Sequence, residues 1–310
     1  MKIKVSTVAF SMNKELVHKL KTTFQDVVIN DQGKRFSRDE LISYFSDADA
    51  VIVGLEKIDE SILLELPRLK IIAKYGVGLD NIDLDACRKH NIEVGWTPGV
   101  NKNSVAEMAL GFMLMLTRNL YVTSNQLKQG NWNKSGGFSM TNQTIGIIGM
   151  GHIGKELASL LTVFDCKILA NDIIDIDTRN FPNVQMVNKE LLYKNSDIIS
   201  VHTPLTPLTK NMIGEQAFSL MKKTAVIINT ARGGIVDELA LKKALNNKSI
   251  AGAALDVYET EPPTDTELLQ FDNLICTPHI AGNSYEAVLA MGEAAIAHIE
   301  NFAYKNKIHE

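Results

Sequence analysis

The sequence predicts an α/β protein of two domains, each built on a parallel sheet flanked by helices. Short apolar runs alternate with stretches whose apolar residues recur at helical spacing, which is typical of parallel strands joined by helices. The pattern occurs twice, before and after a break at Thr97-Pro98-Gly99. The length of 310 residues is long for one hydrophobic core and also favours two domains.

The first series predicts five strands, at residues 2–8, 27–30, 50–55, 69–75 and 92–96. Helices are expected between them, at residues 14–24, 38–45, 60–66 and 84–90. The second series predicts six strands, at residues 145–149, 167–171, 197–202, 224–229, 251–257 and 274–277. Six strands with intervening helices match a complete dinucleotide-binding domain. A last helix is expected over residues 285–304. If it returns to the first domain, the domains are residues 1–99 plus 283–310 and residues 100–282.

Between the two series, the stretch from Ser104 to Leu127 predicts one long helix that is apolar nearly all round. Such a helix must be covered on most of its sides. A connector between domains and a part of a subunit interface both meet this requirement, and the pattern does not choose between them.

Composition excludes several classes of function. Hydrophobic residues make up 45% of the chain, charged residues 22%, and the formal net charge is −4, so we expect a globular protein that binds neither nucleic acid nor membranes. No run approaches the roughly 20 apolar residues of a spanning helix, and the first residues do not read as a signal peptide. Cys87, Cys166 and Cys276 lack metal-ligand spacing, so we expect buried thiols, no metal and a reducing cytoplasm.

The strongest motif is Gly149-Met150-Gly151-His152-Ile153-Gly154, which follows an apolar strand and opens a predicted helix. In this context a G-x-G-x-x-G sequence predicts a turn that binds the pyrophosphate of a dinucleotide, and an ordinary glycine-rich turn is the alternative. Asp172 ends the next strand, where a carboxylate would bond the ribose hydroxyls and repel a 2′-phosphate. It therefore favours NAD over NADP. Asp175 and Asp177 are competing carboxylates that we expect in a solvated loop.

Three segments at strand ends carry polar residues suited to reaction chemistry, at residues 229–234, 256–263 and 277–282. Arg232 follows the strand at 224–229, where its fork could hold a carboxylate and polarise a ketone. His279 follows the last strand and could donate a proton to a carbonyl oxygen near neutral pH. Its carboxylate partner is either Glu259 or Glu261, because spacing does not separate them. His202 is a rival histidine, followed by Pro204 and Pro207 in a loop that we expect to line the cofactor.

Together these segments resemble the D-isomer-specific 2-hydroxyacid dehydrogenase family over nearly the whole chain. The landmarks are Gly76-Val77-Gly78-Leu79-Asp80-Asn81-Ile82-Asp83, Ser104-Val105-Ala106-Glu107, the glycine motif, His202-Thr203-Pro204-Leu205-Thr206, Ala231-Arg232-Gly233-Gly234-Ile235-Val236-Asp237-Glu238, Asp256-Val257-Tyr258 and Pro278-His279-Ile280. The resemblance implies an NAD-dependent dehydrogenase of a small 2-hydroxy acid, with a flavodoxin-like substrate domain and a Rossmann cofactor domain.

The resemblance also implies individual roles. Arg232 matches the substrate-binding arginine, His279 the acid/base histidine and Glu261 its partner. Val77 and Gly78 match the loop whose backbone N–H groups hold the substrate carboxylate. Beyond the glycine motif and Asp172, the positions matched around the cofactor are His202, Thr203, Pro204, Thr230, Ala231, Arg232, Asp256, His279 and Gly282. The region from Ser104 to Leu127 looks like the dimer-forming segment, which predicts a homodimer.

Within the family, the chain looks most similar to short phosphoglycerate dehydrogenases. Lys74 stands where that branch often has an arginine facing the substrate phosphate, which makes it a candidate phosphate ligand; a solvated lysine at a strand end is the alternative. Because the sequence stops at Glu310, we expect no regulatory domain and no serine feedback through one. A glyoxylate or hydroxypyruvate reductase and a nicotinamide-sensing, corepressor-like binding protein are the alternative functions. Glu261 disfavours a formate-type dehydrogenase, since relatives of that kind pair the histidine with Gln.

Overall fold

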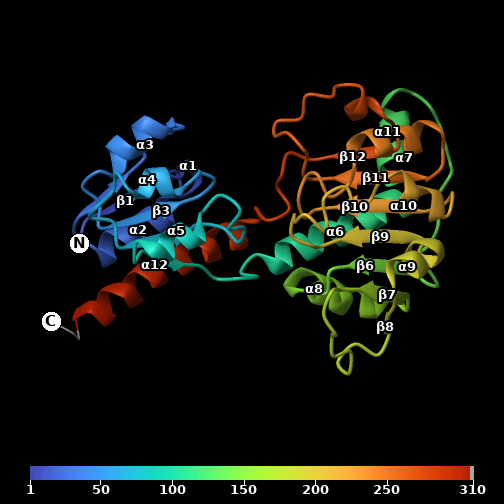
Figure 1. Cartoon of the computed structure of the whole chain (residues 1–310). Helices are drawn as coiled ribbons and strands as arrows, with labels where there is room; N and C mark the ends of the chain where they lie inside the picture. The colour runs from blue at the N-terminus through green and yellow to red at the C-terminus, as the bar shows by residue number, and fades with distance from the viewer. Residues whose placement is uncertain (308–310) are drawn as a thin grey trace. The chain divides into compact units, whose positions relative to one another are not determined.

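The computed structural model describes residues 1–307, and the predicted residues 308–310 of the first domain lie outside that range (Figure 1). The chain forms two compact units, Met1–Asn101 with Asn283–Glu310, and Lys102–Gly282. Each unit contains one sheet whose strands are all parallel. The predicted fold class is confirmed.

The sheet of the first unit has the strand order β2-β1-β3-β4-β5. Its strands are β1 (Ile3–Val5), β2 (Val27–Ile29), β3 (Ala50–Val53), β4 (Ile71–Lys74) and β5 (Glu93–Gly95). Its helices are α1 (Val8–Ser11), α2 (Lys14–Thr23), α3 (Arg38–Phe45), α4 (Glu60–Leu63), α5 (Leu84–Lys89) and α12 (Tyr285–Lys307). Two apolar clusters cover the sheet, and α12 supplies Met291, Ala295 and Ile299 to one of them. The last helix therefore belongs to the first unit.

The sheet of the second unit has the order β12-β11-β10-β9-β6-β7-β8. Its strands are β6 (Thr144–Ile148), β7 (Lys167–Asn171), β8 (Val184–Met186), β9 (Ile198–Val201), β10 (Val226–Asn229), β11 (Gly252–Leu255) and β12 (Leu274–Cys276). The helical segments are α6 (Lys102–Thr117), α7 (Leu120–Lys128), α8 (His152–Leu160), η1 (Leu161–Phe164), α9 (Lys189–Asn195), α10 (Glu215–Leu220), α11 (Glu238–Asn246) and η2 (Leu268–Gln270). The strand order reverses between β6 and β9, and ligands of such sheets bind at the carboxyl ends next to this point.

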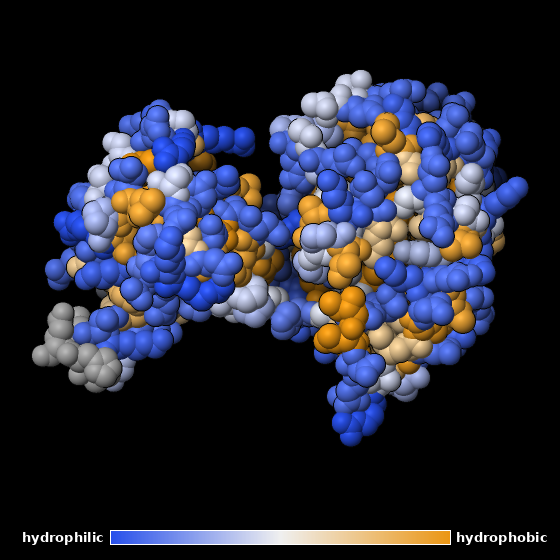
Figure 2. Space-filling model, in the orientation of Figure 1, coloured by the Kyte–Doolittle hydropathy of each residue, from blue (hydrophilic) through white to orange (hydrophobic). Residues whose placement is uncertain are grey.

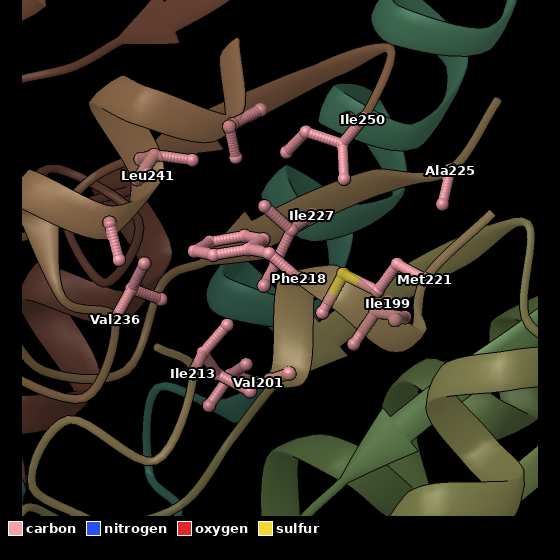
Figure 3. Packing of buried hydrophobic residues seen from close by; sticks show 14 of the residues in the cluster. Ile199, Val201, Ile213, Phe218, Met221, Ala225, Ile227, Val236, Leu241 and Ile250 are labelled. Atoms are coloured by element: carbon pink, nitrogen blue, oxygen red, sulfur yellow. The ribbon is translucent and has the colours of Figure 1, made fainter. Parts of the chain in front are cut away.

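Strands buried on both faces explain the continuous apolar runs in the sequence. Figure 3 shows one face of the second sheet, where Phe218 of α10 lies among Ile227, Val236 and Leu241. Phe218 is 4% exposed and Ile227 is fully buried. Burying a side chain of this size contributes about 1.5–3 kcal/mol relative to leaving it in water. This rigid layer carries the strand ends on which the candidate site is built.

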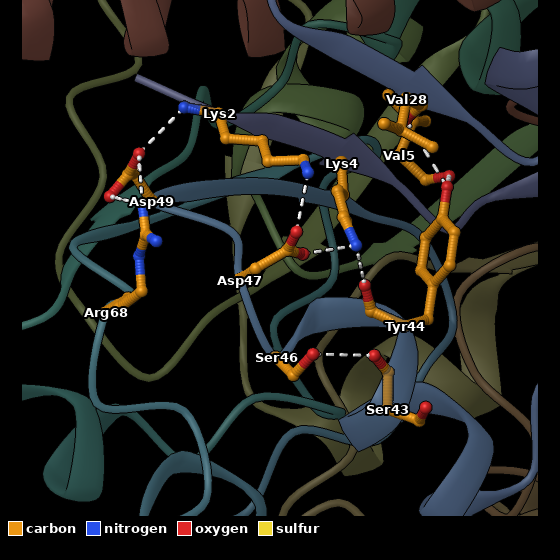
Figure 4. A network of polar contacts seen from close by, with 10 residues as sticks. All are labelled: Lys2, Lys4, Val5, Val28, Ser43, Tyr44, Ser46, Asp47, Asp49 and Arg68. Atoms are coloured by element: carbon orange, nitrogen blue, oxygen red, sulfur yellow. Dashed lines mark hydrogen bonds and ion pairs between the residues drawn. The ribbon is translucent and has the colours of Figure 1, made fainter.

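Polar contacts organise the amino end of the first sheet (Figure 4). Asp47 pairs with Lys2 and Lys4, each at 2.5 Å, while Asp49 accepts a hydrogen bond from the backbone N of Lys2 at 2.7 Å. The hydrogen bonds from Lys2 and Lys4 hold the pKa of Asp47 well below its usual value. Burial raises the pKa of the neighbouring Tyr44 to about 12. These contacts secure the edge opposite to the carboxyl ends of the strands.

The prediction of a single helix from Ser104 to Leu127 is wrong. Two helices, α6 and α7, replace it, and between them Asn119 adopts φ 52°, a left-handed conformation that ends a helix. Ala106, Ala109 and Met113 of α6 are buried in the core of the second unit, whereas α7 has no buried residue. The two parts of the predicted helix therefore have different surroundings.

The number of strands predicted for the second series is also wrong, because β8 adds a seventh. This strand has three residues, and its central Gln185 is exposed. It pairs only with β7, at the edge of the sheet. A short polar edge strand lacks the apolar run that marks the others.

Within residues 1–307, no single helix is both long and apolar enough to cross a membrane. The pair α6 and α7 passes by length and composition, but it is bent by 63° at its junction. Figure 2 shows hydrophilic residues over most of the face in view, with apolar residues in scattered groups.

Candidate active site

The turn between β6 and α8 allows a ligand to approach the backbone closely. Gly149 has φ 98°, and a β-carbon there would lie 2.6 Å from the carbonyl oxygen of His202, so that only glycine fits. Helix α8 begins at His152, and its N-cap residue is Gly151, which has no side chain to cap the first N–H groups of the helix. The first N–H groups and the positive end of the helix dipole therefore suit an anion such as pyrophosphate.

Buried polar atoms at the ends of β9 and β10 fit a bound dinucleotide. His202 Nδ1, Thr203 Oγ1 and Thr230 Oγ1 are buried and have no hydrogen-bond partner within the described part of the chain. Buried polar groups are nearly always bonded, so three unpaired ones at strand ends indicate a place for a polar ligand. Hydroxyl and imidazole groups of this kind can bond the ribose and carboxamide of NAD. The residues present fit the cofactor.

Asp172 lies directly after β7, and backbone contacts orient its carboxylate. Its Oδ2 accepts from Met150 N at 2.7 Å, and its Oδ1 accepts from Ile173 N at 2.7 Å and Ile174 N at 3.3 Å. The first contact ties Asp172 to the glycine turn. A carboxylate has about four lone-pair sites, so acceptor capacity remains for ribose hydroxyls.

His202 is unsuited to proton donation. Burial lowers its pKa to about 4, so the ring is neutral at neutral pH. Its Nε2 lies 2.9 Å from Ser200 Oγ. Its backbone carbonyl faces Gly149, as described above, and its position therefore suits a wall of the cofactor turn. The rival histidine of the sequence is better placed to support the cofactor than to act as an acid.

His279 and Glu261 form the hydrogen bond that acid/base chemistry requires. His279 Nδ1 lies 2.7 Å from Glu261 Oε2, and Glu261 Oε1 accepts from Tyr258 N at 3.1 Å. Glu259, the other carboxylate left open by spacing, instead has its backbone N bonded to Glu238. Both side chains of the pair are partly exposed, 44% for His279 and 38% for Glu261, so the histidine is within reach of a small molecule.

A buried carboxylate holds the loop that carries His279. Asp256 is fully buried, and its Oδ1 accepts from Thr277 Oγ1 at 2.5 Å and Ile280 N at 2.9 Å. Its Oδ2 accepts from Ala281 N at 2.8 Å. His279 lies between these anchors with φ 54°, a conformation that non-glycine residues rarely adopt unless the surroundings impose it. These contacts place Asp256 under the histidine loop; the position near the cofactor that the resemblance implies for it stays a prediction.

Arg232 lies in a loop after β10 that is fixed from both sides. Asn229 Nδ2 donates to the carbonyl of Arg232 at 2.9 Å, while Asn229 Oδ1 accepts from Ala231 N at 3.1 Å. The next residue, Gly233, packs so tightly that a β-carbon would lie 1.8 Å from the carbonyl oxygen of Tyr258. The Arg232 loop therefore lies directly against the segment that leads to Glu261.

The Gly76–Gly78 loop of the first unit follows β4. Lys74 Nζ, at the end of that strand, donates to Asn81 Oδ1 at 2.6 Å and to the carbonyl of Gly54. Asn81 Nδ2 donates to the carbonyls of Gly54 and Glu56. Lys74 is only 5% exposed, so the alternative of a solvated lysine is wrong. The lysine before the loop and Asn81 after it tie both flanks of the loop to the segment after β3.

The remaining predicted positions differ in exposure. His152 and Pro204 are exposed, Ile153 and Gly282 are half-buried, and Gly154 and Ala231 are buried. Reasoning from sequence missed Asn229 and Asn81, whose side chains hold the two loops proposed to contact substrate. A polar residue ending an apolar strand was a signal for Asn229. Nothing comparable marks Asn81.

Comparison with known proteins decides the family. Residues 110–281 match the sequence model described as D-isomer specific 2-hydroxyacid dehydrogenase, NAD binding domain. A glyoxylate reductase from Thermofilum pendens is 42% identical over 270 residues, which cover 84% of this chain and 79% of that protein. The chain belongs to the D-isomer specific 2-hydroxyacid dehydrogenases.

Other members of the family are also similar. A D-3-phosphoglycerate dehydrogenase from Methanocaldococcus jannaschii is 38% identical over 261 residues; these cover 83% of this chain but 50% of that protein. A D-lactate dehydrogenase from Aquifex aeolicus, solved with NAD and lactic acid, superposes with a TM-score of 0.85 at 29% identity, covering 98% of this chain and 96% of the other. The predicted family, its small 2-hydroxy or 2-oxo acid substrate class and its cofactor NAD are confirmed at this level.

We predict that this dehydrogenase prefers NADH to NADPH in kcat/KM because the Asp172 carboxylate repels a 2′-phosphate. Asp172→Asn keeps the shape but removes the charge, and it should narrow the preference by roughly tenfold. Steady-state kinetics with both cofactors measure this, with Asp175→Asn as a control in the neighbouring loop. Equal efficiency of the wild type with both cofactors would contradict the assignment.

Proposed function

We propose that this chain catalyses reversible hydride transfer at C2 of a short 2-hydroxy acid, with Arg232, Glu261 and His279 as its reacting groups. The observation that carries this proposal is the 2.7 Å contact between His279 Nδ1 and Glu261 Oε2. An acid/base histidine needs a partner that fixes its ring and stabilises its charged form, and a carboxylate at this distance does both.

The same contact determines which ring nitrogen transfers the proton. With Nδ1–H donated to Glu261, Nε2 is the nitrogen that exchanges a proton with substrate. In reduction, the imidazolium donates from Nε2 to the oxygen of the 2-oxo group; in oxidation, the neutral ring accepts the hydroxyl proton. Glu261 stabilises the charged ring. When bound, NAD(H) supplies or accepts the hydride at C2.

The Arg232 guanidinium and backbone N–H groups would orient the 2-oxo acid substrate. The fixed fork of Arg232 suits both the substrate carboxylate and the carbonyl oxygen that becomes negative during reduction. The N–H groups of Val77 and Gly78 have no protein acceptor within residues 1–307 and are therefore available to a carboxylate. Gly149, Gly151, Asp172, Thr203 and Thr230 would hold the dinucleotide.

We propose an unphosphorylated substrate, such as glyoxylate or hydroxypyruvate. Lys74, the candidate phosphate ligand, is buried, and its ammonium bonds Gly54 and Asn81 of its own unit. These contacts favour support of the adjacent loop over recognition of a phosphate. The similarity to a glyoxylate reductase over most of both chains adds support. Phosphoglycerate is the second candidate, favoured by the similarity to phosphoglycerate dehydrogenases.

We also propose that the chain forms a homodimer through α7 and the segment at residues 130–139. All of residues 130–139 are exposed. Large apolar side chains are found here at Leu120, Leu127, Trp132 and Phe138, each at least 50% exposed. Clustered exposed apolar residues of this size are typical of a protein interface. Seven residues of α6 are buried, whereas α7 has none, so the second part of the predicted dimer segment offers the more exposed surface.

Replacing His279 with Ala should lower kcat for 2-oxo acids by about 10²–10⁴-fold because the proton donor is lost. NADH affinity, measured by fluorescence titration, should change little. His18→Ala, at an exposed position of α2, is the matched control. Retention of turnover within a few-fold would exclude His279 as the acid. A wild-type chain that binds NADH but turns over no 2-oxo acid would instead support the binding-protein alternative.

Lys74→Met should reduce kcat/KM by a similar factor, roughly tenfold, on glyoxylate, hydroxypyruvate and phosphohydroxypyruvate. The physical reason is that the loop loses its ties to Gly54 and Asn81 whichever substrate is bound. Steady-state rates on the three acids measure this, with Lys70→Met as the control at an exposed lysine before the same strand. A loss confined to the phosphorylated acid would show that Lys74 binds phosphate.

Sedimentation velocity at micromolar concentration should give twice the mass of one chain. Replacing Trp132 and Phe138 together with Ser should weaken the dimer by at least tenfold, because each ring contributes about 1.5–3 kcal/mol when buried. Val163→Ser, at an equally exposed apolar residue of η1, should leave the mass unchanged. A monomeric wild-type chain would contradict the proposed interface.

A further inference from the structure

Trp96 makes a polar contact with the substrate loop of the first unit. Trp96 directly follows β5 and directly precedes the break at Thr97-Pro98-Gly99. The indole Nε1 donates a hydrogen bond to the carbonyl oxygen of Val77 at 2.8 Å. None of the roles assigned above uses this side chain.

The contact constrains the peptide group between Val77 and Gly78. A trans peptide is planar, and its C=O and N–H point in opposite directions. When the indole holds the Val77 carbonyl, the Gly78 N–H is turned away from Trp96 and kept in one orientation. The loop needs such a restraint, because Gly76 adopts φ 133°, a region open to glycine with little steric resistance.

The backbone of Trp96 is itself firmly held. Gly95 packs against His298 of α12 so closely that a β-carbon would lie 2.4 Å from His298 Cβ. On the other side, Thr97 Oγ1 lies 2.9 Å from His298 Nε2. Burial lowers the pKa of His298, which favours a neutral ring that can accept at one nitrogen and donate at the other. The indole therefore extends from a fixed base.

Packing does not explain the indole. Trp96 is 36% exposed, whereas core side chains of this unit such as Phe10 and Phe45 are at most 1% exposed. Its ring borders, together with Leu79, a hollow of about 390 Å³. A tryptophan at the rim of a hollow contributes less to the core than its size allows, and among residues 1–307 the directional contact of its side chain is the bond to Val77.

We propose that Trp96 is a positioning residue that fixes the Val77–Gly78 peptide so that the Gly78 N–H can bind the carboxylate of the substrate. The inference rests on the proposed function, since it assumes that this loop holds the carboxylate. Lys74, just before the loop, and Asn81, just after it, restrain its two flanks, and Trp96 restrains the Val77 carbonyl between them. The ligand class recognised is the carboxylate shared by all short 2-oxo acids.

Two substitutions at one position test the proposal. Trp96→Phe keeps an aromatic ring but removes the donor. It should raise KM for glyoxylate and hydroxypyruvate by three- to tenfold, the value of one hydrogen bond. The values of kcat and of KM for NADH should stay within twofold. Trp96→His restores a donor, because Nε2 of the smaller ring can occupy the place of indole Nε1. Relative to Trp96→Phe, it should reverse at least half of the increase in log KM.

The outcomes separate the inference from the function on which it rests. Equal KM values for Trp96→Phe and Trp96→His, or an unchanged KM in both, would overturn the role of the donor. A parallel fall in kcat and in the midpoint of thermal unfolding would show a merely structural residue. Absence of turnover in the wild type would contradict the proposed function instead. Oxamate inhibition constants, measured on the same variants, should follow the KM values for the 2-oxo acids.

Discussion

All strands within each sheet run in the same direction, and the candidate site depends on this constraint. In the second unit, the loops after β6, β9, β10, β11 and β12 emerge at one edge. The glycine turn, His202, Arg232 and the Glu261 and His279 segments all follow strand ends there. In the first unit, by contrast, the ion pairs around Asp47 lie at the amino ends of the strands. Reactive groups and structural charge thus lie at different ends of their strands.

Loop positions at this edge are set by hydrogen bonds from buried side chains at the ends of the strands. Asp256 follows β11, yet it binds the backbone of the segment after β12 and holds His279 in a left-handed conformation. Asn229, the last residue of β10, holds the Arg232 loop in the same manner. A conformation that costs on the order of 1–3 kcal/mol persists only where the surroundings impose it. The core strands therefore determine the geometry of the reacting groups.

Much of this fold could be predicted from the sequence, because buried parallel strands have continuous apolar sequences and the glycine motif identifies the cofactor turn. The break at Asn119 could not, because the apolar spacing continues through it and only the backbone conformation changes. The short polar strand β8 carries no such run. Likewise, the burial of Lys74 and the indole contact of Trp96 depend on partners from other segments. The choice of Glu261 over Glu259 required a distance that spacing alone does not contain.

The division of the first unit along the chain has a consequence for its synthesis. Met291, Ala295 and Ile299 of α12 complete an apolar cluster whose other members include Ile3, Val5 and Phe10. The ribosome makes the α12 residues only after the whole second unit, so one face of the first sheet lacks one of its covering helices until the second unit has been made. Since domains generally fold as units when their residues emerge, the second unit can finish folding first, while the earlier segment still lacks the apolar side chains of α12.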